Sequence, residues 1–61
     1  MNIKKGDRVR ALHHEFKGEE GTVYDIYEKT IIIVEFDKFP VKVATPISNL
    51  KLIEKASDRI Q

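Results

Sequence analysis

Apolar and polar residues alternate strictly near the start of the chain. In residues 7–12, Val9 and Ala11 fall on one face, whereas Arg8 and Arg10 fall on the other. A period of two is typical of a strand with one buried and one solvated face. The polar residues 13–20 break this pattern, so we expect a strand followed by a loop.

Two glycines frame the return of the chain from this loop. Gly18 and Gly21 are expected to supply a positive φ or a close backbone approach where the loop re-enters the sheet. After them, Val23 and Ile26 are three residues apart. Both can face the core only if a β-bulge at residue 24 or 25 absorbs one extra residue. The pattern therefore predicts a second strand that is bent.

The rest of the chain reads as three more strands. Residues 30–36 are rich in β-branched side chains and place Ile32, Val34 and Phe36 on one side. Pro40 has no N–H, so it suits the start of a fourth strand over residues 41–45. Residues 46–49 predict one turn of 3₁₀ helix, and residues 50–53 a last short strand.

Together these elements predict an all-β fold, a five-stranded SH3-like small barrel with one 3₁₀ turn before the last strand. Such closure protects the sheet edges; an open antiparallel sheet is the alternative. The barrel is expected to occupy residues 1–54, and residues 55–61 to be a frayed helical turn or disordered. The expected core is Val9, Ala11, Val23, Ile26, Val34, Phe36, Val41, Val43 and Leu50, with Leu52 or Ile53.

Length and composition limit the function further. A chain of 61 residues buries only about 60% of the surface that it exposes when unfolded. It has no cysteine, which fits a reducing compartment, and its longest apolar run is residues 31–34, far too short to span a bilayer. We therefore expect a cytoplasmic protein with no membrane association.

Charge is distributed in blocks. Residues 1–18 carry five Lys and Arg against two acidic residues, residues 19–37 one against six, and residues 38–61 five against two. Such asymmetry indicates either an anion-binding surface or simply solvated faces.

Residues 13–15 (His-His-Glu) form the one cluster with metal-ligand side chains. No third ligand follows at a fixed spacing, and no hydroxyl has a recognisable histidine and carboxylate companion. The sequence therefore predicts a protein that is not an enzyme and has no metal site and no cofactor.

The segment from Lys5 to Val23 resembles the KOW motif through Gly6, Val9, Gly18, Gly21 and Val23. This resemblance implies an SH3-like barrel that contacts RNA or protein. The chain also resembles, more weakly, the SH3-like subunit IV of photosystem I, which helps to dock ferredoxin, but it lacks that subunit's long insertion between the last strands. The positions shared with it are Gly6, Val9, Arg10, Leu12, Glu15, Gly21, Thr22, Val23, Ile26, Val34, Phe36 and Lys38.

Two functions follow from the expected fold. The first is weak binding of RNA or DNA, because the first and last strands of an SH3-like barrel are neighbours and would gather basic side chains for phosphate contacts. The expected contacts are Arg8, Arg10, Lys51 and Lys55, with Lys42 extending the surface. The alternative is an adaptor that binds a protein partner or forms a homodimer. It would use the outward apolar side chains of Tyr24, Tyr27, Ile31 and Ile33.

Overall fold

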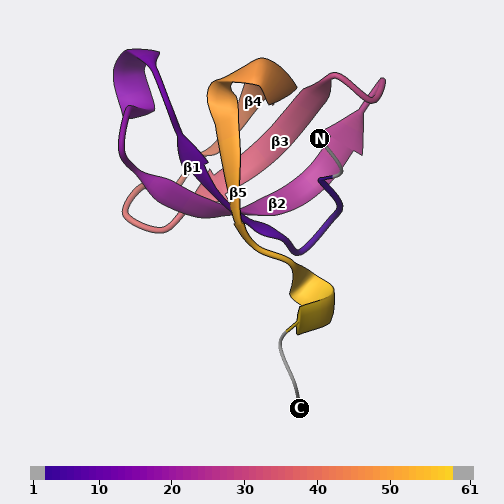
Figure 1. Cartoon of the computed structure of the whole chain (residues 1–61). Helices are drawn as coiled ribbons and strands as arrows, with labels where there is room; N and C mark the ends of the chain where they lie inside the picture. Colours follow the sequence, from indigo (N-terminus) through magenta and orange to yellow (C-terminus); the bar gives the residue numbers. More distant parts are fainter. Residues whose placement is uncertain (1–2, 59–61) are drawn as a thin grey trace.

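The computed structural model describes residues 3–58, which form five β-strands and three single turns of 3₁₀ helix (Figure 1). The strands are β1 (Arg8–Ala11), β2 (Glu20–Tyr27), β3 (Ile31–Phe36), β4 (Lys42–Pro46) and β5 (Leu50–Glu54). The 3₁₀ turns are η1 (His14–Phe16), η2 (Ile47–Asn49) and η3 (Ala56–Asp58). Among these residues no helix is long and apolar enough to cross a membrane.

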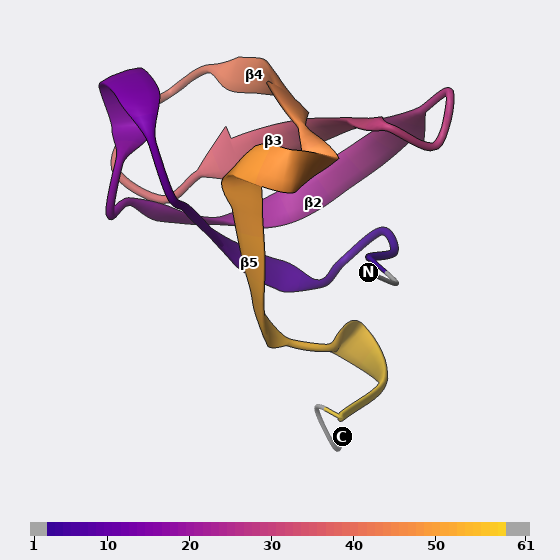
Figure 2. The same cartoon turned by 45° about the horizontal axis from the view of Figure 1, so that its top comes forward.

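All five strands belong to one antiparallel sheet with the order β4-β3-β2-β1-β5. The first and last strands are therefore neighbours, as predicted. The sheet curls, and η2 carries the chain from β4 to β5 across the open side (Figure 2). This arrangement confirms the SH3-like barrel, including the 3₁₀ turn before the last strand.

The core lies on the concave side of the sheet, where alternate residues of each strand meet. Ile32, Leu50, Val9 and Val34 are fully buried. The pairing of β2 with β3 shifts between Val23 and Asp25, which is the predicted bulge. Because of this shift, Ile26 also packs against the core.

The prediction was wrong at Val41, whose side chain is 48% exposed. β4 begins only at Lys42, and its pairing with β3 ends where Lys42 lies opposite Glu35. The space beside Phe36 is filled instead by Phe16 of η1, whose ring stacks on that of Phe36 with centroids 4.6 Å apart. A loop residue thus replaces the expected strand residue in the core.

At the end of the chain, Leu52 packs on the core and Ile53 is exposed, which decides between these two residues. The expected tail contains η3, and the backbone N–H of Ala56 donates to the buried carboxylate of Asp7. Residues 59–61 lie outside the described part of the chain, so the boundary at residue 54 stays a prediction.

Candidate nucleic-acid-binding surface

The outward face of β1 presents Arg8 and Arg10 between β5 and β2. On one side, Arg10 lies opposite Lys51 and Arg8 lies opposite Glu54, both on β5. On the other side, Arg10 lies opposite Glu20, and Arg8 lies opposite Thr22, both on β2. Residues directly opposite in an antiparallel pair share a face, so Lys51, Arg10 and Glu20 form one row across the sheet.

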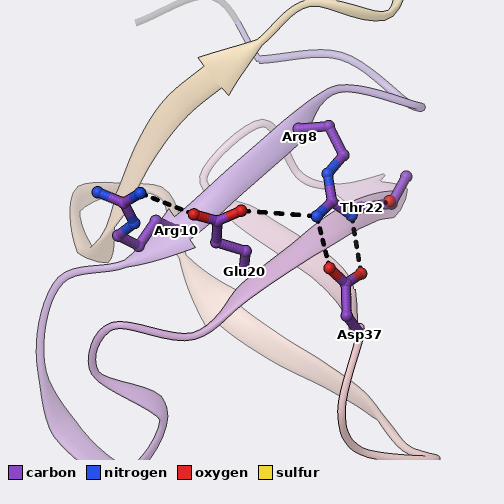
Figure 3. A network of polar contacts seen from close by, with 5 residues as sticks. All are labelled: Arg8, Arg10, Glu20, Thr22 and Asp37. Atoms are coloured by element: carbon purple, nitrogen blue, oxygen red, sulfur yellow. Dashed lines mark hydrogen bonds and ion pairs between the residues drawn. The ribbon is translucent and has the colours of Figure 1, made fainter.

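Both arginines are held by carboxylates (Figure 3). The Arg8 guanidinium donates through Nη1 and Nη2 to the two carboxylate oxygens of Asp37, at 2.8 and 2.5 Å. Arg8 Nη1 also donates to Thr22 Oγ1 at 2.9 Å. Glu20 bridges the two arginines: one oxygen accepts from Arg10 Nη2 at 2.7 Å and the other lies 3.7 Å from Arg8 Nη2.

These contacts shift the pKa values of the strongest pair. The hydrogen bond from Arg8 lowers the pKa of Asp37, and the hydrogen bond to Asp37 raises the pKa of Arg8. Such a two-pronged contact favours the charged form of both groups. Arg8 and Asp37 therefore remain an ion pair through the neutral range.

The other basic residues that were predicted to bind nucleic acid lie in two places. Lys51 is exposed on β5, and no carboxylate within residues 3–58 forms an ion pair with it. Lys55 follows the same strand, and its ammonium lies 3.6 Å from the Asp7 carboxylate. The structure thus brings Arg8, Arg10, Lys51 and Lys55 to the β1–β5 side, where Glu54 of β5 also lies opposite Arg8.

Lys42 is not part of this group. It lies on β4, and both β3 and β2 separate that strand from β1. Its ammonium is 3.8 Å from a carboxylate oxygen of Glu35 and 4.7 Å from the ring centroid of Tyr24. The expectation that Lys42 extends the basic surface gains no support from this geometry.

The residues of the adaptor hypothesis also differ in exposure. Tyr24 and Tyr27 are 52% and 60% exposed. Ile31 and Ile33 are only half-buried, since Ile31 lies between Tyr27 and Pro46, and Ile33 between Asp25 and Ala44. Ile31 and Ile33 therefore expose less apolar surface beside the two tyrosines than the sequence predicts.

His13 and His14 are exposed beside and within η1, with ring centroids 6.1 Å apart. The described residues contain no group of three or more side chains that could hold a metal ion.

Sequence reasoning missed Glu20 and Asp37 as the partners of the two arginines. It placed Glu20 in a loop, whereas β2 begins at Glu20. It placed Asp37 in the turn after the third strand, where the structure also has it, but did not bring that turn next to Arg8. A strand starting one residue earlier would have placed Glu20 and Thr22 on the same face as the arginines.

No family model matches the chain. Large ribosomal subunit protein uL24 of Amoebophilus asiaticus (strain 5a2) is 36% identical over 77 aligned positions, which cover 97% of this chain and 67% of that protein. The chain belongs to the KOW family of SH3-like barrels. This KOW chain also matches the crystal structure of the MjSpt4:Spt5 complex in conformation B, with a TM-score of 0.83 and 29% identity. That match covers 90% of this chain but only 40% of the other.

These relatives confirm the KOW resemblance and the SH3-like fold. The family assignment confirms the prediction that the chain is not an enzyme.

Proposed function

We propose that this KOW chain is a nucleic-acid-binding module that works in the cytoplasm and contacts phosphates weakly through the β1–β5 side of its sheet. The pairing of β1 with β5 carries the proposal, because it sets Arg10 directly opposite Lys51. Lys55 extends the same side beyond the end of β5. The similarity to a protein of the large ribosomal subunit supports RNA as the ligand.

Binding should be weak because carboxylates already hold much of the basic charge. Arg8 is engaged by Asp37 and Glu20, and Arg10 by Glu20. Lys51 therefore makes the clearest single contribution. The few remaining phosphate contacts imply strong sensitivity to salt.

The test is fluorescence anisotropy of a labelled single-stranded RNA at low salt, with Lys51→Glu and Lys29→Glu as a matched pair. Both residues are exposed, and both substitutions change the charge equally, but Lys29 lies in the turn between β2 and β3. We expect Lys51→Glu to weaken binding clearly more than Lys29→Glu. Equal loss of RNA affinity in the two variants would show that binding depends only on the net charge of the protein. Absence of binding at low salt would reject the proposal.

A second candidate function is a protein-binding adaptor that uses Tyr24 and Tyr27 with the half-buried Ile31 and Ile33. The strong exposure of both tyrosines favours it, since exposed tyrosines are common at protein interfaces. The matched solved structure is also a complex of two proteins. A partner captured from lysate after nuclease treatment, and lost in Tyr27→Ala, would support this function over the first.

A further inference from the structure

A pocket of about 160 Å³ lies between η1 and the edge strand β4. Its apolar walls come from Phe16 of η1, Phe36 of β3 and Val43 of β4. An apolar cavity of about 150 Å³ accommodates one benzene ring. The pocket therefore has the size of a single aromatic ring.

The lining of the same pocket also includes polar groups. The exposed residues His13 and His14 border it, and Asn49 of η2, which is 9% exposed, forms part of the wall. Asn49 Nδ2 donates to the carbonyl oxygen of His13 at 3.2 Å, whereas Asn49 Oδ1 is buried and has no hydrogen-bond partner among the described residues. A buried acceptor without a partner is unfavourable, so the wall favours a ligand that brings an N–H donor.

The pocket lies at the same end of β1 and β5 as the pair Arg10 and Lys51. Two of its lining residues are Ala11, which directly follows Arg10, and Asn49, which precedes Lys51 by two residues. At about 3.3 Å per residue, the basic pair is within about 7 Å of these two residues along the strands. The basic side chains lie on the outward face, so a ligand reaches both places by passing over the ends of β1 and β5, beside η1 and η2 (Figure 1).

The acidic groups near this end limit where phosphates can lie. Arg10 is paired with Glu20, and Glu54 lies at the other end of β5, away from the pocket. Among the described residues that line the pocket, Glu15 is the only acidic one. Phosphates therefore fit on the Lys51 side, and an uncharged ring fits inside the pocket. This combination suits a polyanion with aromatic bases better than an aromatic residue of a protein.

We propose that this pocket binds one unpaired base of an RNA whose phosphates contact Lys51 and Arg10. The inference rests on the proposed function and adds a base-binding site to it. Proteins commonly recognise RNA through unstacked bases, which contact aromatic or histidine rings and form hydrogen bonds at their edges. Here the walls formed by Phe16 and Val43 receive the ring, and Asn49 Oδ1 is the acceptor for a base N–H.

The test compares two short RNAs of equal length and charge. One is abasic throughout, and the other carries a single central uracil. Each is titrated at low salt into the full, isotope-labelled chain and followed by amide chemical shifts. The RNA with uracil should bind about five- to tenfold more tightly, which is the lower end of what contact between a base and aromatic side chains provides. Only that RNA should shift the amides of residues 13–16 and 43–45.

Val43→Phe and Val41→Phe form a matched pair of variants. Both make the same uncharged change, but Val43 lines the pocket, whereas Val41 is 48% exposed and does not line it. Val43→Phe should fill the pocket and abolish the preference for the RNA with uracil, and Val41→Phe should keep it. The ratio of the two affinities is a suitable measure because partial unfolding lowers both affinities equally.

His14→Gly keeps the test valid if Val43→Phe disturbs the core. His14 has a φ of 71°, a left-handed conformation that glycine adopts readily, so this variant should not lower the midpoint of thermal unfolding. It removes the imidazole beside the pocket and should reduce the preference for uracil.

The inference is overturned if the wild-type protein binds both RNAs equally, if Val43→Phe and His14→Gly both keep the preference, or if Val41→Phe abolishes it. In these cases the proposed function survives, because RNA still binds. If a capped phenylalanine amide shifts the amides of the pocket and the uracil has no effect, the pocket takes a protein side chain instead. Failure to bind either RNA would reject the proposed function, and the inference with it.

Discussion

The carboxylate of Asp7 accepts a hydrogen bond from the backbone N–H of Ala56, 2.7 Å away, and so links the beginning of the fold to its end. The same carboxylate accepts from the backbone N–H of Lys4 at 2.9 Å and lies 3.6 Å from the ammonium of Lys55. Asp7 is almost completely buried. A buried charge is tolerated only with such partners, so Asp7 organises both ends of the chain.

Asp7→Asn should therefore destabilise the protein. The amide keeps the size of the side chain but loses the charge and one acceptor, which leaves a backbone N–H without its partner. We expect the free energy of unfolding to fall by about 1 to 3 kcal/mol, measured by urea denaturation. Glu28→Gln, at an exposed turn position, is the control. A change of less than about 0.5 kcal/mol would be that of an ordinary surface site and would contradict this role.

Stability should also depend on pH through Asp7. Burial alone would raise the pKa of this carboxyl, but the N–H groups of Ala56 and Lys4 and the charge of Lys55 outweigh burial and hold the pKa below its ordinary value of 3.8. A depressed pKa in the folded state gives stability that is complete above the ordinary pKa and is lost as the pH falls through the folded value. Unfolding followed at stepwise lower pH should show this loss below about pH 4, and Asp7→Asn should reduce it. An unchanged profile in that variant would assign the acid sensitivity to other carboxylates.

The strands could be predicted because local alternation reports which side chains face the core. Val9 and Ala11 on β1 and Ile32, Val34 and Phe36 on β3 are buried as expected. The spacing of Val23 and Ile26 was enough to place the bulge, since only an extra residue lets both side chains reach the core.

Contacts between distant segments could not be predicted in the same way. Alternation assigns Arg8 to the outward face but does not reveal that Asp37, from a block of opposite charge, lies against it. For this reason the distribution of charge along the sequence overestimates how much basic charge β1 can offer to a ligand. The prediction that Val41 is buried was wrong for a related reason. The side chain that packs beside Phe36 is Phe16, which is twenty residues earlier in the sequence.

The two glycines of the first loop and second strand should respond differently to alanine. Gly21 does not have a positive φ, contrary to the first of the two expectations, but it makes the close approach. A Cβ there would lie 2.6 Å from the carbonyl oxygen of Glu35 and 2.9 Å from the Cα of Phe36. Gly18 has a φ of +87° and open space around it.

Gly21→Ala should cost about 1 to 3 kcal/mol, because β2 and β3 must separate to admit the methyl group. Gly18→Ala should cost about 1 to 2 kcal/mol through backbone strain alone. Urea denaturation measures both, and amide chemical shifts distinguish the causes. Gly21→Ala should perturb residues 34–36 of β3, whereas Gly18→Ala should perturb only the loop. A neutral Gly21→Ala would show that the strands adjust without cost.

The salt dependence of RNA binding should report how many cations contact phosphate. Lys51 forms no ion pair within residues 3–58, Arg10 is paired with Glu20, and Lys55 lies beside Asp7, whereas Arg8 is held by both Asp37 and Glu20. Three phosphate contacts at about 0.7 to 0.9 each give a log–log slope between about −2 and −3. Lys51→Ala should make the slope shallower by nearly one contact, and Lys29→Ala should leave it unchanged. Anisotropy titrations over a range of salt concentrations measure these slopes. A wild-type slope steeper than about −4 would mean that Arg8 or Lys42 also reaches phosphate, which requires Asp37 or Glu35 to release its partner when RNA binds.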